Sequence, residues 1–212
     1  MKTDELIAML AKGEAATPPG AVKARIWIAL AVGFAGAALF VALRLGFRPM
    51  DVLMHDRSFG MKAAYTAALA VIGLWTVRRM ARPGMNAALP AVPLTAVLLG
   101  IGMMSWMQLM GSDPVDWPAM WMGSSWQRCP MWIVISAVPT YAAVVWALRQ
   151  AAPTRPVAAG AAAGFLAGAV GATAYGLHCP EAAAPFIALW YSLGIAISTG
   201  LGAVGGRWLL RW

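Results

Sequence analysis

Long apolar stretches alternate with short polar segments along this chain, and six of the stretches are long enough to cross a membrane. A helix needs about 20 mainly apolar residues to span about 30 Å of hydrocarbon. The six stretches cover residues 26–43, 63–77, 89–110, 131–148, 157–177 and 185–209. The second is the shortest, and we expect Met61 and Lys62 to extend it, with the Lys62 ammonium reaching the headgroup layer. The pattern predicts an all-α, polytopic bundle of six transmembrane helices.

The composition excludes a water-soluble globule and agrees with a lipid setting. Apolar residues make up 61% of the 212 residues and charged residues 11%, whereas soluble domains carry about 25% charged residues. The first 24 residues are more polar and lack the basic start of a cleavable signal. We therefore divide the chain into a tail and linker, residues 1–24, and a transmembrane domain, residues 25–212.

Positive charge is concentrated in the segments that share a side with the two termini. An even number of spans places both termini on one side, where eleven Lys or Arg and three Asp or Glu fall; the other side carries five of each. The positive-inside rule then predicts cytoplasmic termini. The formal net charge of +8 is thus a signal of topology, and we expect no direct binding of nucleic acid.

Small residues recur at four-residue spacing in the last two stretches. The fifth stretch carries Gly160, Gly164 and Gly168, and the sixth carries Gly194, Ser198, Gly202 and Gly206. Because such ladders let helix backbones approach closely, they predict a tight helix pair, formed within one chain or between the copies of a homo-oligomer. The alternative is a glycine-lined path for a substrate.

The six apolar cores contain no Asp, Glu, His, Lys or Arg, the side chains that carriers and proton pumps usually place in their spans. The sequence also lacks nucleotide-binding, metalloprotease and nucleophile-elbow motifs, so we expect no enzyme. The rival function is a small metal or thiol transporter whose entrance site is formed by Met and Cys side chains on the outer side.

Two cysteines fall on the predicted outer side, Cys129 before the fourth stretch and Cys179 after the fifth. Two thiols at one membrane level can form a disulfide or bind a soft metal. His178 could activate the neighbouring thiol or supply a further metal ligand. The plain alternative is a pair of buried, inert cysteines.

Methionine and tryptophan gather on the same side. Met103, Met107 and Met110 form a stripe of thioethers that suits Cu(I), although such stripes more often fill gaps in packing. The segment 116–126 is rich in Trp and suits the headgroup level, either as a lid near Cys129 or as a simple aromatic belt.

The tail carries a short amphipathic pattern. Thr3 can cap a helix whose first turn holds Asp4 and Glu5. An apolar patch follows, formed by Leu6, Ile7, Met9 and Leu10. A short helix of this kind on a flexible linker is typical of a ligand that lies in the groove of a protein partner; the alternative is a helix on the inner leaflet.

Several segments resemble the NrsF family, six-helix negative regulators of extracytoplasmic-function sigma factors in proteobacteria. They are Met1-Lys2-Thr3-Asp4-Glu5-Leu6-Ile7, Arg82-Pro83-Gly84, residues 148–156, Tyr175-Gly176-Leu177-His178-Cys179-Pro180-Glu181, Trp190-Tyr191 and Leu210-Arg211-Trp212. The resemblance covers nearly the whole chain. Ala182 departs from it, since a second acidic residue is expected after Glu181, and this puts a carboxylate role in metal binding in doubt.

The resemblance implies an anti-sigma factor of the bacterial inner membrane that is not an enzyme and needs no obligatory cofactor. The tail, through Asp4, Glu5, Leu6, Ile7 and Leu10, would hold the sigma factor until a stress signal arrives outside. The resemblance also implies that Cys129 and Cys179 sense an oxidant or a heavy metal such as copper, zinc or cadmium.

Overall fold

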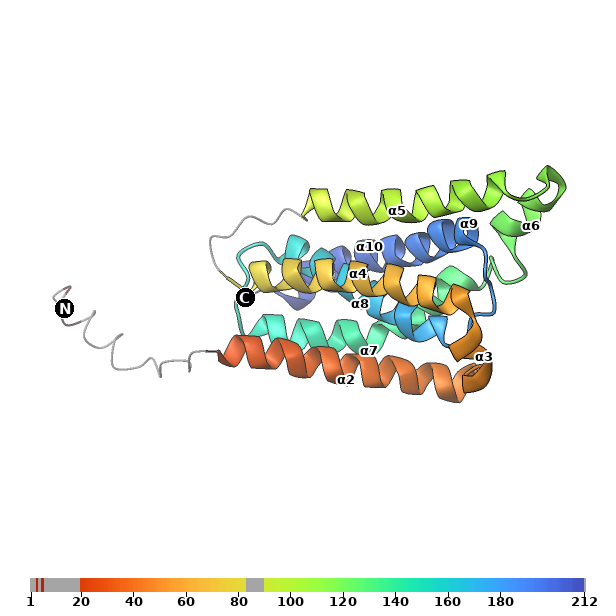
Figure 1. Ribbon diagram of the computed structural model, residues 1–212. Helices are drawn as coiled ribbons and strands as arrows, with labels where there is room; N and C mark the ends of the chain where they lie inside the picture. Colours follow the sequence, from red (N-terminus) through yellow and green to blue (C-terminus); the bar gives the residue numbers. More distant parts are fainter. Residues whose placement is uncertain (1–2, 4, 6–19, 83–89, 212) are drawn as a thin grey trace.

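The computed structural model describes residues 3, 5, 20–82 and 90–211, which form helices and connecting turns without a strand (Figure 1). In these ranges, six helical segments are long and apolar enough to cross a membrane, which confirms the predicted all-α bundle. Thr3 and Glu5 are helical, and the rest of the predicted tail helix lies outside the described residues.

The long helices are α2 (Ala21–Arg44), α4 (Arg57–Met80), α5 (Ala91–Met110), α7 (Cys129–Arg149), α8 (Pro156–Gly176) and α10 (Ser192–Leu209). A short helix, α9 (Ala184–Phe186), and a π-helical turn, η2 (Ile187–Tyr191), run directly into α10 and complete the sixth apolar segment. Residues 20–82 and 90–211 also contain three more short helices: α3 (Met50–His55), η1 (Pro114–Asp116) and α6 (Trp117–Met122).

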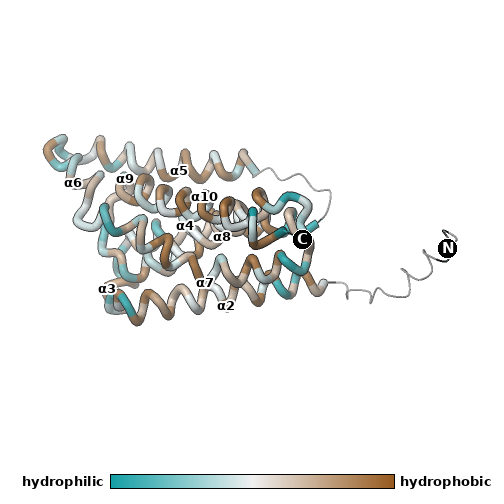
Figure 2. The backbone as a smooth tube through the Cα atoms, turned by 180° about the vertical axis from the view of Figure 1, so that it is seen from behind, coloured by the Kyte–Doolittle hydropathy of each residue, from teal (hydrophilic) through white to brown (hydrophobic). Residues whose placement is uncertain are grey.

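The start of α2 and the C-terminal end of the chain lie at one end of the bundle, here called the proximal end (Figure 1). The opposite, distal end carries α3, α6 and α9 (Figure 1). Figure 2 shows hydrophobic residues along the helices and hydrophilic residues mainly toward the two ends. This distribution is the one expected of a chain whose middle lies in hydrocarbon.

Helix α8 occupies the centre of the bundle, where it contacts α2, α4, α7 and α10. Gly and Ala make up 14 of its 21 residues, and 78% of its apolar window is buried. A thin helix can be surrounded on several sides because its neighbours reach its backbone. The composition of this segment therefore determines how closely the other helices approach.

The closest approach joins α8 to α10, and glycines are required there. A Cβ atom on Gly160 would lie 2.3 Å from the Gly202 carbonyl oxygen, and one on Gly164 would lie 2.3 Å from the Ser198 carbonyl oxygen. Likewise, a Cβ atom on Gly206 would lie 2.5 Å from the Pro156 carbonyl oxygen. The two predicted ladders thus pack together within one chain.

One member of the ladders was assigned to the wrong contact. A Cβ atom on Gly194 would lie 2.9 Å from Ile133 of α7, so this glycine faces α7 and not α8. Gly168, in contrast, lies against Ser198 and Ile195 of α10 as predicted.

Helix α5 is peripheral, and its methionine stripe faces outward. Only 17% of its apolar window is buried, and Met103, Met107 and Met110 are 61%, 66% and 51% exposed. The stripe therefore fills no gap in the core of the described chain. Its exposure on a peripheral apolar helix places the thioethers where lipid would cover them.

Two glycines of α10 allow a direct test of the close approach. A Cβ atom on Gly202 would lie 2.5 Å from the Gly160 carbonyl oxygen, whereas one on Gly200 would meet nothing within 4 Å. We expect Gly202→Ala to destabilise the bundle by about 1–3 kcal/mol, the usual cost of overpacking, and to lower its thermal unfolding temperature in detergent. Gly200→Ala is the matched control, and equal unfolding temperatures for the two variants would contradict the assignment.

Candidate functional site

Both cysteines lie at the distal end in one buried cluster. Cys129 is the first residue of α7, and Cys179 lies in the connection between α8 and α9. Each is 0% exposed, and each is a free thiol. Tyr175 and Tyr191 belong to the same cluster and are likewise buried. The sequence prediction that places the two thiols at one end of the bundle therefore agrees with the structure.

Local backbone geometry holds each cysteine in place. The Cys129 N–H donates to the Ser125 carbonyl oxygen at 2.9 Å, and the Cys179 N–H donates to the Tyr175 carbonyl oxygen at 3.0 Å. Pro130 follows Cys129 in the first turn of α7, a position where a missing N–H costs nothing. Cys129 is thus fixed at a helix start and Cys179 just after a helix end.

Three sets of polar contacts, here called braces, hold the segment 177–181 that carries Cys179. Lys62 forms the first brace, and the expectation that it reaches the headgroups is wrong. Its side chain is only 1% exposed, and Nζ donates to the Cys179 carbonyl oxygen at 2.8 Å. Helix α4 begins at Arg57, earlier than predicted, so Lys62 stands inside a helix and points into the bundle. A buried ammonium is costly unless it is hydrogen bonded, which marks this residue as part of the site.

The connection between α2 and α3 forms a second brace. The Arg48 N–H donates to the Leu177 carbonyl oxygen at 3.1 Å, and His178 Nδ1 lies 2.9 Å from the Gly46 carbonyl oxygen. Gly46 has a φ of +79°, a conformation that favours glycine. The His178 ring also lies against Tyr175, with 5.9 Å between the ring centroids.

An ion pair stabilises this second brace. Arg48 Nη1 lies 2.8 Å from Asp56 Oδ2, and the Ser58 N–H donates to Asp56 Oδ1 at 2.8 Å. Ser58, and after it Arg48, lower the pKa of the Asp56 carboxyl to about 2 against the opposing effect of burial. Asp56 therefore stays ionised at any pH near neutrality, and the start of α4 keeps its carboxylate cap.

Glu181 forms a third brace to the segment that precedes α7. Its Oε1 accepts hydrogen bonds from the Ser124 N–H at 2.8 Å, from Ser124 Oγ at 2.7 Å and from Ser125 Oγ at 3.0 Å. Gly123 has a φ of +54°, and a Cβ atom there would lie 2.5 Å from Glu181 Oε2. The carboxylate thus ties the segment beside Cys179 to the segment beside Cys129.

The Trp-rich segment 116–126 packs onto the distal end. Trp126 lies against Trp190, with 5.2 Å between ring centroids, and packs on the cluster that holds both cysteines. Trp190 Nε1 donates to the Trp121 carbonyl oxygen at 2.8 Å, and Trp117 Nε1 donates to the Leu109 carbonyl oxygen at 3.0 Å. These contacts favour the lid over a simple aromatic belt.

Two features of the structure bear on the expected chemistry of the thiols. The two cysteines are not close enough to form a pair in this conformation, so no disulfide is preformed. His178 is held by Gly46, and the described part of the chain contains no group of three or more His, Cys, Asp or Glu that could hold a metal. Cys129, Cys179 and His178 therefore do not form a three-ligand site. Reaction at either thiol requires the lid or the braces to open first.

Sequence reasoning named Lys62, His178 and Glu181 but missed the contacts that they make. Lys62 acts on Cys179 across 117 positions of the chain, and Glu181 acts on Ser124 across 57. The available signal was a single lysine inside the start of an otherwise apolar span, because such a residue is retained only where it has a partner.

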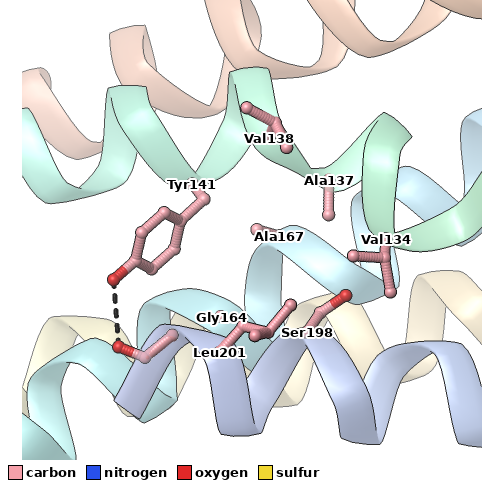
Figure 3. A pocket seen from close by; sticks show the side chains of 9 residues that line it. Val134, Ala137, Val138, Tyr141, Gly164, Ala167, Ser198 and Leu201 are labelled. Carbon is pink, nitrogen blue, oxygen red and sulfur yellow. Dashed lines mark hydrogen bonds between the residues drawn. The ribbon is translucent and has the colours of Figure 1, made fainter. Parts of the chain in front are cut away.

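A small cavity between α7, α8 and α10 offers little room for a substrate. Its volume is about 90 Å³. Apolar side chains such as Val134, Val138 and Leu201 line it, and Tyr141 closes one side by donating to the Gly202 carbonyl oxygen at 2.9 Å (Figure 3). The glycine ladders serve helix packing here and do not line an open path.

Comparisons with known proteins agree over the full length of the chain. The family NrsF, described as negative regulator of sigma F, matches residues 10–212. A probable anti-sigma-F factor NrsF of Azospira oryzae is 38% identical over 213 residues, with 100% of both chains covered. An anti-sigma-F factor NrsF of Caulobacter vibrioides is 37% identical over 215 residues, again with 100% of both chains covered. No solved structure matches the chain.

Lys62→Met tests whether the first brace limits access to Cys179. Met has a similar length but cannot donate, so we expect Cys179 to react with a small alkylating reagent about tenfold faster, as one charged hydrogen bond of about 1.5–3 kcal/mol is lost. The rate is read by mass spectrometry of the labelled peptide in a Cys129→Ser background.

Thr76→Val is the matched control for this substitution. Thr76 is buried in the same helix, and its hydroxyl donates only to the Ile72 carbonyl oxygen one turn away. An unchanged Cys179 rate in Lys62→Met, or an equal acceleration in Thr76→Val, would show that Lys62 does not control the access.

Proposed function

Because the chain belongs to the NrsF family of negative regulators of sigma F, we propose that it is an anti-sigma factor of the bacterial inner membrane. In this proposal its N-terminal tail holds an extracytoplasmic-function sigma factor on the cytoplasmic side. Reaction of Cys129 or Cys179 with a heavy metal or an oxidant on the outer side releases the sigma factor. The role is regulatory, and no catalytic step is assigned to the chain.

The observation that carries this proposal is the separation of the two ends. Both cysteines lie at the distal end, whereas α2 begins at Ala21 at the proximal end, where the tail joins it. The cation-rich segments, including Arg78 and Arg79, also lie at the proximal end. The positive-inside rule then favours a cytoplasmic proximal end and outward-facing thiols.

Burial of the thiols explains how a chemical signal could move helices. Any metal or oxygen atom added to a fully buried sulfur needs space that the close-packed cluster does not have. Cys129 begins α7, and α7 packs along α2, where a Cβ atom on Gly33 would lie 2.6 Å from the Thr140 backbone. A shift of α7 therefore displaces α2, to which the tail is joined.

Release also requires a difference in affinity between two states. A signal shifts the equilibrium only if it binds or reacts more favourably in the released state than in the holding state. The braced conformation described above, with its thiols apart and covered, suits the holding state. The released state is then one in which the lid or the braces have opened and the thiols are accessible.

The sigma-binding residues of the proposal are Asp4, Glu5, Leu6, Ile7 and Leu10, of which only Glu5 is among the described residues. The apolar members would enter a groove of the sigma factor, and the acidic members would add charge complementarity. The tail is short, so most of the helical order would form on binding.

The tail assignment predicts a loss of retention. In cells that coexpress the sigma factor, Leu6→Asp with Leu10→Asp should move most of it from the membrane fraction to the soluble fraction, because each substitution places a charge in an apolar contact. The matched control is Ala15→Asp with Ala16→Asp, which adds the same charge elsewhere in the tail. Full membrane retention in the Leu variant would sink the assignment.

The thiol assignment predicts a loss of response. Cys129→Ala with Cys179→Ala should retain the sigma factor at the membrane before and after challenge with an oxidant or a soft metal, whereas the parent chain releases it. Thiol trapping with a membrane-impermeant reagent, before and after challenge, reports which cysteine reacts on the outer side. Normal release from the double variant would show that the signal enters elsewhere.

A further inference from the structure

The proximal ends of α2 and α4 enclose two adjacent cavities lined by cationic side chains. The first, of about 460 Å³, is lined by Lys23, Arg78 and Arg82 together with the start of α2. The second, of about 440 Å³, is lined by Trp75, Arg78, Arg79 and Arg82. Arg78 and Arg82 line both, so the cavities form one continuous basic site.

Among the described residues, the guanidinium groups of Arg78 and Arg79 lie over aromatic rings and form no ion pair. Arg78 lies over the Trp27 ring at 4.8 Å from its centroid, and Arg79 lies over the Trp75 ring at 5.6 Å. The Nε atoms of both arginines are buried and have no hydrogen-bond partner within residues 20–82 and 90–211. Stacking fixes the plane of a guanidinium while its N–H donors stay available to a ligand.

The ligand that fits this site is anionic. Apart from Glu5, the described carboxylates lie at the distal end, and the one ion pair found among described residues joins Arg48 to Asp56 there. A planar guanidinium binds phosphate through two parallel hydrogen bonds, a geometry that several adjacent arginines strengthen.

The depth of the site identifies the source of the phosphate. Trp27 and Trp75 are 47% and 48% exposed on the outside of apolar helices, and half-exposed tryptophan at a helix end marks the headgroup layer. Basic pockets between transmembrane helices on the cytoplasmic side are suited to anionic lipid headgroups. A lipid is therefore favoured over a soluble anion.

We propose that Arg78, Arg79 and Arg82 bind the phosphates of an anionic phospholipid, and that the paired cavities accommodate two linked phosphates, as in a diphosphatidylglycerol. Lys23 adds a fourth cation from the first turn of α2. Gly20, which lines the first cavity, has a φ of +92° and is the point from which α2 begins. A bound lipid would fix the base of the tail, so this inference goes beyond the proposed sigma-factor chemistry and does not depend on it.

Native mass spectrometry of the full-length chain in a neutral detergent tests the site. Diphosphatidylglycerol, phosphatidylglycerol and phosphatidylcholine are titrated in parallel, and inorganic phosphate is added as a competitor. We expect diphosphatidylglycerol to bind most tightly and phosphatidylcholine not to bind. Arg78→Gln with Arg79→Gln and Arg82→Gln should weaken diphosphatidylglycerol binding by about tenfold or more, given the contribution of each cation near a headgroup.

The matched control removes the same charge from the same end of the bundle. Arg155, Arg207 and Arg211 are exposed and line neither cavity, so their replacement by Gln should change binding by less than about threefold. An equal loss in this control would show that net charge alone attracts the lipid and would overturn the site.

Further arms separate the parts of the proposal. If phosphatidylglycerol binds as tightly as diphosphatidylglycerol, the two-phosphate assignment is overturned. If millimolar inorganic phosphate displaces the lipid, the ligand of the site is a free anion and not a lipid. If the Gln variant does not fold, a variant with the three arginines replaced by Lys provides a second test, because it keeps the positive charge. Weaker lipid binding by the Lys variant supports bidentate contacts, whereas unchanged binding would overturn them.

Discussion

Contact between the backbones of α8 and α10 is the constraint on which the rest of the structure depends. Apolar side chains have no hydrophobic reason to associate in lipid, so helix packing relies on close van der Waals contact. Gly160, Gly164, Gly202 and Gly206 allow that contact by removing every side-chain atom from it. Once α10 lies this close, α4 and α7 cover the remaining sides of α8 with larger residues, such as Leu74 of α4 and Ile133 of α7.

The central position of α8 determines which backbone groups need hydrogen-bond donors at the distal end. Helix α8 ends at Gly176, and Cys179 is fully buried in the turn that leads to α9, although Pro180 and Ala182 in the same turn are exposed. Carbonyl groups buried in a turn need donors. The N–H of Arg48 and the ammonium of Lys62 supply two of them, to Leu177 and Cys179. The polar braces around the thiols follow from the need to satisfy this backbone.

The sequence predicted what depends on composition and short spacing. Six apolar segments were predicted because length and hydropathy alone decide whether a helix can cross a membrane, and the glycine ladders because four-residue spacing places residues on one helix face. The start of α4 at Arg57 was missed because Asp56 caps a helix that begins in a polar segment.

Partners distant in sequence could not be predicted. His178 was assigned to the cysteines on adjacency, yet its ring is held by Gly46, which lies 132 positions away. Lys62 was assigned to the headgroups on its usual behaviour, yet the turn after α8 offers a closer acceptor. Both outcomes depend on which elements pack together, and no local pattern contains that information.

The arrangement of the two ends limits how a signal could cross the bundle. The thiol cluster is joined to the proximal end by rigid helices, and two of these, α7 and α8, begin or end at the cysteines. Because α8 is fixed on α10 by contacts without side chains to adjust, it resists a small displacement. Helix α7 contains Pro139, whose ring removes one helical hydrogen bond, and it packs there against Gly36 of α2. Pro139 therefore marks the point at which α7 can bend against α2, the helix to which the tail is joined.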